Sequence, residues 1–241
     1  MLHKTRGIVL RVTDYSESSV IVKIYTEKLG VQSYLVQGVK KPKAKIKMNM
    51  LQPLHLLDMV VYHKPNVGLQ KISDARSFPI LSDLPYNIVK SSIAIFLNEI
   101  IHKSVKEQID DALLFEYIYS SVVLLDNTEE SVSNFHLVFL MKLSRFLGFY
   151  PDVSYADTSS YFDLKEGAFV RYQPPHVFFI EPKYLSAFIE MLRLPLRDFG
   201  QWKIDAATRK YLLNSVLGYF SLHVDSFGVM KSQEILEEVL G

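Results

Sequence analysis

Short segments in which apolar and polar residues alternate fill the first third of the chain. This period of two indicates β-strands with one buried face, and the Val, Ile and Tyr content of the segments is typical of strands. Turn-forming residues separate most of the segments, so neighbouring strands are joined tightly. Five strands within about 75 residues predict a small antiparallel barrel such as an OB-fold. The expected strands cover residues 7–12, 19–26, 31–37, 54–63 and 69–76.

Beyond Phe78 and Pro79 the apolar residues recur every three or four positions. That spacing places them on one face of a helix, which predicts a helical remainder of the chain. Gly148 is placed to end the clearest helix, and Asp205 is placed to cap the start of a later one. The expected helices cover residues 85–102, 110–125, 131–147, 205–223 and 232–240.

The helical period is interrupted between Pro151 and Glu181, where Tyr, Asp, Ser and Gly are frequent. We expect an irregular or hairpin insert there, and the absence of a fixed-length repeat argues against a solenoid. The predicted fold class is therefore α+β with two domains. An OB-fold barrel takes residues 1–80, and an all-α helical domain takes residues 81–241 with its insert at 152–181.

The composition is that of an ordinary globular protein. Of 241 residues, 49% are hydrophobic and 22% are charged, which excludes a disordered or low-complexity chain. The absence of cysteine excludes disulfides, thiolate metal sites and a cysteine nucleophile, and it fits a reducing cytoplasm. Charged residues interrupt the apolar runs before the roughly 18 residues of a membrane span, and Arg11 and Asp14 break up any signal-peptide core. We expect a cytoplasmic protein with no membrane segment.

Charge is distributed unevenly along the chain. The formal net charge is only +1, yet residues 1–80 hold thirteen Lys and Arg against five Asp and Glu, a balance of +8 that leaves −7 for the rest. Five of these lysines lie between positions 40 and 47 with no acid among them, in the longest connection of the predicted barrel. A polyanion would relieve their mutual repulsion, and lysine–phosphate contacts release condensed counterions. The segment is therefore either a nucleic-acid-binding loop or a solvated basic loop with no partner.

An OB-fold that binds a nucleic acid strand needs a cationic track for the phosphates and aromatic faces for the bases. Tyr34 or Tyr25 is the candidate stacking platform, although each could instead pack inside the barrel. Because lysine is a point charge without a bidentate fork, we expect no base-sequence specificity. The candidate phosphate contacts are Arg11, Lys40, Lys41, Lys43, Lys45 and Lys47.

Four short motifs in the first 151 residues resemble those of one family. They are Thr13-Asp14-Tyr15-Ser16-Glu17-Ser18, Gly38-Val39-Lys40-Lys41-Pro42-Lys43, Leu51-Gln52-Pro53 and Leu147-Gly148-Phe149-Tyr150-Pro151. In residues and order they are similar to motifs of the recombination mediator RecO, a bacterial DNA repair family. The resemblance implies an N-terminal OB-fold, a helical C-terminal domain, binding of single- and double-stranded DNA, and strand annealing. It also implies the partner RecR and help in loading RecA onto strands coated with single-stranded-DNA-binding protein.

The insert departs from that of many relatives, which carry four cysteines there as a zinc module. With no cysteine and only His176 nearby, we expect no zinc and no other cofactor. Packing of aromatic side chains must then hold the insert together. The candidates are Tyr155, Tyr161, Phe162, Phe169, Tyr172 and Phe178.

The resemblance further implies a partner peptide, because the family binds the acidic C-terminal tail of single-stranded-DNA-binding protein on its helical domain. Lys142 and Arg145 beside Phe146 form one candidate dock for that tail. The alternative is that Phe146 belongs to the core and that both cations are simply solvated.

Patterns that indicate catalysis are missing from the sequence. The adjacent acids Asp110-Asp111 and Glu129-Glu130 point apart, so neither pair makes a two-metal centre. The histidines form no metal-binding pair, and glycine-rich phosphate loops and GxSxG elbows are absent. We therefore expect a non-catalytic protein. The alternatives to a mediator are an adaptor whose acidic helical domain recruits partners and an RNA-binding OB-fold protein without annealing activity.

Overall fold

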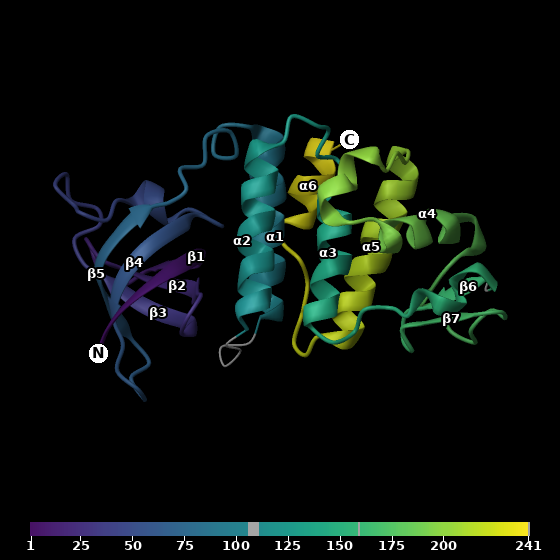
Figure 1. The fold of residues 1–241 in the computed structure, drawn as a ribbon, viewed down its shortest axis with the longest axis horizontal. Helices are drawn as coiled ribbons and strands as arrows, with labels where there is room; N and C mark the ends of the chain where they lie inside the picture. The colour runs from purple at the N-terminus through teal and green to yellow at the C-terminus, as the bar shows by residue number, and fades with distance from the viewer. Residues whose placement is uncertain (106–110, 159, 241) are drawn as a thin grey trace. The chain divides into compact units, whose positions relative to one another are not determined.

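The chain folds into two compact units, Met1–Asn127 and Thr128–Gly241. The structure, a computed structural model, describes residues 1–105, 111–158 and 160–240, so Asp110 of the first acid pair lies outside the described residues. Figure 1 shows a β-barrel with helices α1 and α2 in the first unit, and the remaining helices with the short strands in the second. The helical region expected from residue 81 is thus shared between the two units.

Five strands close into a barrel in the order β1-β2-β3-β5-β4, which confirms the predicted architecture. Neighbouring pairs are antiparallel except β3 and β5, which run parallel with Tyr34 opposite Gln70 and Leu35 opposite Lys71. The prediction of an antiparallel barrel is wrong for this one pair. Strand direction cannot alternate around a closed ring with an odd number of members, so at least one pair must be parallel. The strands are β1 (Leu2–Asp14), β2 (Val20–Thr26), β3 (Gly30–Val36), β4 (Leu56–Tyr62) and β5 (Gln70–Ser77).

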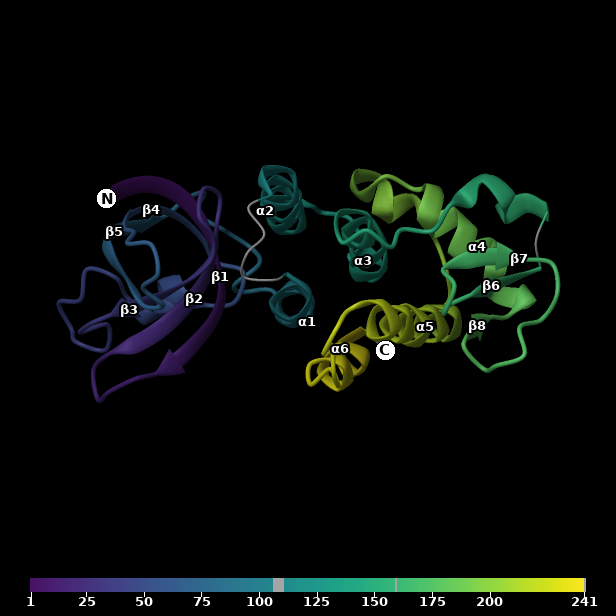
Figure 2. The ribbon, with the colours of Figure 1, turned by 90° about the horizontal axis from the view of Figure 1, so that it is seen from below.

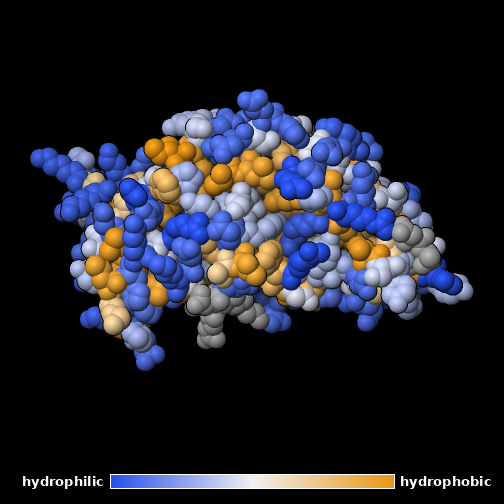
Figure 3. Space-filling model, viewed as in Figure 1, coloured by the Kyte–Doolittle hydropathy of each residue, from blue (hydrophilic) through white to orange (hydrophobic). Residues whose placement is uncertain are grey.

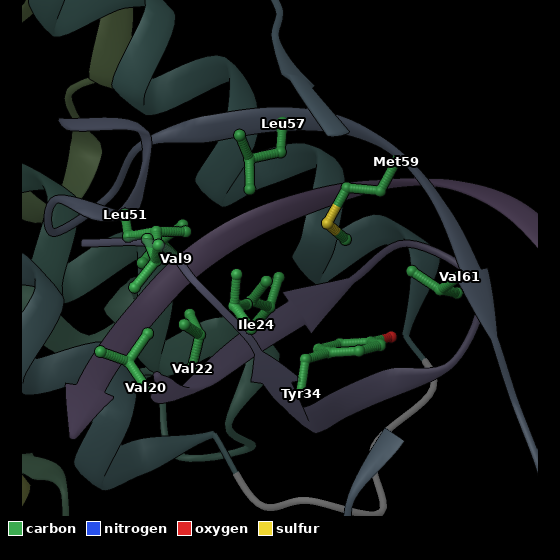
Figure 4. Packing of buried hydrophobic residues seen from close by; sticks show 11 residues of the cluster. Val9, Val20, Val22, Ile24, Tyr34, Leu51, Leu57, Met59 and Val61 are labelled. Atoms are coloured by element: carbon green, nitrogen blue, oxygen red, sulfur yellow. The ribbon is translucent and has the colours of Figure 1, made fainter. Parts of the chain in front are cut away.

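Apolar side chains from several strands fill the barrel interior. Figure 4 shows Ile24, Tyr34 and Met59 together in this core, each contributed by a different strand. They follow the alternation that predicted the strands, because every second side chain of a strand points inward. At Gly7, β1 passes so close to the core that a Cβ atom would lie 2.4 Å from Met59 Cε and 2.8 Å from Ile24 Cγ2. Any larger residue at this position would force those two side chains to shift.

Helices α1 (Ile88–Ser104) and α2 (Ala112–Asn127) belong to the same unit as the barrel. Asn87 caps α1, since its side-chain oxygen accepts hydrogen bonds from two backbone N–H groups of the first turn. Farther along α1, the buried Asn98 donates a 2.7 Å hydrogen bond to the carbonyl of Leu10 in β1. This hydrogen bond from the buried NH2 group of Asn98 ties the helix to the strand.

Arg6 of β1 connects the barrel to α2. Its guanidinium forms two hydrogen bonds with Glu27, of 3.1 and 2.9 Å, and one of 2.8 Å with Glu116 of α2. The same group lies over the rings of Phe115 and Tyr119, at 5.3 and 4.6 Å from their centroids. Charge-assisted hydrogen bonds and ring contacts together hold the Arg6 side chain in one orientation. These contacts explain why α2 lies in the compact unit of the barrel.

The second unit combines helices with a small sheet. Two predicted caps are confirmed: Gly148 has a φ of +87° after the end of α3, and the Asp205 carboxylate accepts a 2.8 Å hydrogen bond from the N–H of Thr208 in α5. Helix α4 is absent from the sequence-based prediction, although Pro182 at its start and buried Leu185 and Phe188 at helical spacing are signals for it. The helices of this unit are α3 (Phe135–Phe146), α4 (Pro182–Arg193), α5 (Ala206–His223) and α6 (Gln233–Leu240). Among the described residues the 3-10 helices are η1 (Met48–Leu51), η2 (Val153–Thr158) and η3 (Leu196–Gln201).

The insert is more regular than expected, because three short strands form an antiparallel sheet in the order β7-β6-β8 beside α4 (Figure 2). Phe162 is fully buried and packs on Phe169 and Phe188, with ring centroids 4.9 and 4.8 Å apart, which confirms part of the predicted aromatic core. The prediction is wrong for Tyr155 and Tyr172, which are 68% and 85% exposed because they lie in η2 and in the loop after β7. The strands are β6 (Tyr161–Asp163), β7 (Ala168–Val170) and β8 (Phe179–Ile180).

Candidate nucleic-acid interface

The basic loop between β3 and η1 is attached to the barrel by apolar residues and exposed between them. It begins at Gly38, which has a φ of +69° and whose carbonyl accepts a 3.0 Å hydrogen bond from the N–H of Lys41. Val39 is buried, Ile46 packs against the barrel core, and Leu51 of η1 is buried as well. The loop extends from the barrel at the left of Figure 1, where Figure 3 shows a largely hydrophilic surface. All five predicted lysines of the loop are exposed.

A groove of about 410 Å³ separates this loop from β5. Lys41, Lys43 and Lys45 line it from the loop, and Lys71 lines it from β5. Lys71 is not among the residues predicted from the sequence, because only the parallel pairing of β3 with β5 brings it opposite Leu35. Apolar side chains form the rest of the wall, so the groove has a cationic rim above an apolar surface. The apolar lining residues are Leu35, Val36, Ala44, Ile46 and Ile72.

The other predicted cations lie outside the groove. Lys40 turns to β1, where its ammonium group lies 2.7 Å from a carboxylate oxygen of Asp14. Arg11 is exposed on β1 opposite Lys23 of β2, and Lys47 is exposed immediately before η1. The structure therefore brings three of the six predicted phosphate contacts together. The contribution of the other three to binding stays a prediction.

Tyr34 cannot offer a stacking face, so this prediction is wrong. Its ring is fully buried in the barrel core, where its hydroxyl group has no hydrogen-bond partner and burial raises its pKa (Figure 4). Tyr25 is also buried, and its hydroxyl donates a 3.0 Å hydrogen bond to the carbonyl of Asp111. The physical reason is the strand alternation, which turns Tyr34 and Val36 to the same inner face of β3. None of the described residues that line the groove is aromatic.

Lys142, Arg145 and Phe146 lie close to one another on α3, but the Lys142 side chain is already engaged. Its ammonium group donates hydrogen bonds of 2.5 Å to the carbonyl of Leu192 at the end of α4 and of 3.2 Å to the Tyr150 hydroxyl. Burial, with a smaller effect of Arg145, lowers the pKa of Lys142 to about 8. Arg145 is exposed with its guanidinium 4.6 Å from the centroid of the Tyr150 ring, and Phe146 is half-buried. Lys142 therefore stabilises the end of α4, while Arg145 and Phe146 reach the surface.

The residues of the insert do not fit a zinc module. The sequence has no cysteine, and the structure, over the residues it describes, brings no three His, Asp or Glu side chains together as metal ligands. His176 lies 3.3 Å from a carboxylate oxygen of Asp163, whose other oxygen accepts hydrogen bonds from the backbone N–H groups of Lys165 and Glu166. Two potential ligands are too few for a closed tetrahedral site.

Comparison with known proteins identifies the family. Residues 1–78 match the family model described as Recombination protein O N terminal, and residues 85–233 match the model described as Recombination protein O C terminal. A DNA repair protein RecO of Azobacteroides pseudotrichonymphae is 38% identical over 239 residues, and one of Bacteroides fragilis is 36% identical over 240, with 99% of each chain covered in both matches. One of Flavobacterium psychrophilum is 31% identical over 238 residues, 98% of each chain. With both of its parts matched in order and its relatives similar from end to end, the chain belongs to the RecO family of DNA repair proteins.

Proposed function

We propose that this chain is a non-catalytic recombination mediator that binds single- and double-stranded DNA through its barrel. The observation that carries the proposal is the groove in which Lys41, Lys43, Lys45 and Lys71 converge on an OB-fold barrel. Ammonium groups on the two sides of the groove neutralise phosphates of one strand and release condensed counterions, whatever the base sequence. A single strand enters the groove between loop and β5, and a duplex contacts the exposed lysines of the rim.

Strand annealing follows from the same electrostatics. Two complementary strands repel each other through their phosphates, and a cationic surface lowers that repulsion while the bases pair. This process needs no nucleotide hydrolysis. In repair, the protein would anneal strands together with RecR on DNA coated with single-stranded-DNA-binding protein. This activity would prepare those strands for RecA.

We place this activity in the bacterial cytoplasm, where the chromosome is. In the described part of the chain, no helix has the length and apolar character to cross a membrane.

A binding series with a fluorescent single-stranded oligonucleotide tests the proposal. With three to four lysines on phosphates, the logarithm of the affinity should fall with the logarithm of salt concentration at a slope of about −2 to −3. The full chain should also accelerate the pairing of complementary strands without ATP. Binding without acceleration would identify an adaptor instead, and stronger competition by RNA than by DNA would identify an RNA-binding protein.

For the acidic tail of single-stranded-DNA-binding protein, we propose a dock at Arg145 and Phe146 on α3. Arg145 offers an exposed cation, and the half-buried ring of Phe146 offers an apolar contact beside it. Lys142 contributes to this dock indirectly, because its hydrogen bond to the carbonyl of Leu192 fixes the end of α4 beside α3. Titration of a fluorescent tail peptide should show about tenfold weaker binding by the Arg145→Ala variant, as expected for loss of a charged contact. Equal affinities would exclude this dock.

The absence of zinc also stays a prediction. It rests on the missing cysteines and on the insert being held by its sheet and by the packing of Phe162. Metal analysis of the purified protein checks it, and stoichiometric zinc would contradict it.

A further inference from the structure

The groove that carries the proposed function also contains a carboxylate. Asp74 lines it on the same strand as Lys71. Between Val60 and Val61 the pairing of β4 with β5 shifts register, which leaves Ser73 as an extra residue next to Asp74. A bulge of this kind re-aims the neighbouring side chains. Asp74 is exposed and lies along the groove that a phosphate chain would follow.

A second carboxylate acts on the same loop from β1. Asp14 holds the ammonium group of Lys40 at 2.7 Å, and Lys40 does not line the groove. Both side chains are solvent-accessible, with 76% of Asp14 and 38% of Lys40 exposed. Exposed ion pairs of this kind are weak and exchange readily with other partners. Asp14 therefore competes with a phosphate for Lys40.

We infer that Asp74 and Asp14 act as electrostatic brakes on the nucleic-acid interface, holding the affinity for a single strand below the value that the lysines alone would give. The inference rests on the proposed function and adds a regulatory element to it. A mediator has to release its strand to the next protein, and a site with unopposed lysines would release it slowly. Asp74 opposes binding by repelling phosphates in the groove, and Asp14 opposes it by occupying Lys40.

The two brakes differ in their salt dependence, which makes them separable. Removing the charge of Asp74 creates no new lysine–phosphate contact, so the affinity rises while the salt slope stays the same. Removing Asp14 frees Lys40 to reach a phosphate, so the affinity rises and the slope steepens by about 0.7.

The test compares Asp74→Asn and Asp14→Asn with the wild-type full chain in oligonucleotide binding at about 50 mM salt. Each variant should bind about three- to tenfold more tightly, Asp74→Asn because a charge that repels phosphates at the protein surface is removed and Asp14→Asn because Lys40 becomes available to a phosphate. Strand dissociation should slow by a similar factor. Asp74→Ser and Asp14→Ala repeat the measurement without an amide that could bind a lysine, and thermal unfolding confirms that each variant is folded.

Glu17→Gln is the matched control. Glu17 is exposed in the turn after β1, and it does not line the groove, so its replacement makes the same change in net charge without touching either brake. If the Asp74 and Asp14 variants bind no more tightly than Glu17→Gln, the brakes do not exist. A wild-type chain that binds no oligonucleotide at low salt would instead refute the proposed function itself, so the two failures are distinguishable.

Discussion

Replacing Lys41, Lys43 and Lys45 by alanine is expected to weaken binding of a single-stranded oligonucleotide by about 100-fold at about 50 mM salt. The three side chains carry most of the positive charge that lines the groove, and Lys71 alone remains. Each lost phosphate contact removes about 0.7 from the salt slope, so the slope should flatten to about −0.7. The measurement is fluorescence anisotropy over a range of salt concentrations, with the annealing rate as a second readout.

The barrel offers a control with the same change in charge. Lys4, Lys28 and Lys64 are exposed on the barrel unit and do not line the groove, so their triple alanine variant loses the same three charges elsewhere. It should retain a salt slope close to that of the wild type and lose only the small, long-range part of the affinity. If the two triple variants weaken binding equally, net charge rather than the groove determines affinity.

The sequence predicts the barrel well because its signals are local. Each strand alternates within itself, and the lysines of the loop follow one another along the chain, so both features are visible without knowledge of the fold. Lys71 differs in this respect. It joins the other lysines only through the parallel pairing of β3 with β5, a contact between segments far apart in sequence.

The prediction for Tyr34 fails for a different reason, because it rests on the type of the residue and ignores its position in the strand. Stacking on bases needs an aromatic ring, which favours a tyrosine of the barrel as the candidate. The position of Tyr34, however, has the same parity as Val36, so the alternation itself assigns it to the interior. Tyr15 is 59% exposed in the turn after β1, next to Asp14, and exposure of this kind is what a stacking platform needs.

The local sequence pattern also does not show that α1 and α2 belong to the same unit as the barrel. The change of period near Pro79 marks where strands give way to helices, and this local pattern predicts a domain boundary there. Two polar anchors instead join the first helices to the barrel: Asn98 binds the carbonyl of Leu10, and Arg6 binds Glu116. Neither contact has a signature in the sequence, because each joins residues that are 88 or 110 positions apart.

The second large effect concerns Asp126, whose replacement by alanine is expected to destabilise the barrel unit by about 3 kcal/mol. This buried carboxylate at the end of α2 accepts hydrogen bonds of 3.0, 3.0 and 2.7 Å from the backbone N–H groups of Ser82, Asp83 and Leu84. The segment it binds connects the barrel to α1. Alanine would leave these N–H groups without their acceptor. The bond to Leu84 is buried and the other two are partly buried, and an unpaired buried donor costs more than the hydrogen bond itself contributes.

The measurements are thermal unfolding followed by circular dichroism and hydrogen exchange of the three amides, which should accelerate in the variant. The neighbouring residue supplies the control: Asn127 is exposed at the end of the same helix, so Asn127→Ala should change the free energy of unfolding by less than about 0.5 kcal/mol. Similar effects of the two substitutions would mean that the end of α2, and not the carboxylate, stabilises the connection.

The difference in the free energy of unfolding between the wild type and Asp126→Ala should depend on pH, and the sign of that dependence follows from the pKa of Asp126. Burial raises the pKa of Asp126, but the hydrogen bonds from the three N–H groups and the nearby Lys90 ammonium together outweigh it and leave the pKa below its usual value of 3.8. A carboxylate with a depressed pKa in the folded state contributes its full stabilisation above the unfolded pKa and loses it as the pH falls through the folded pKa. The wild type should therefore exceed Asp126→Ala in stability by a constant amount at neutral pH, and the difference should shrink below about pH 4. A difference that stays constant down to pH 2 would show that the stabilisation comes from packing of the side chain rather than from its charge.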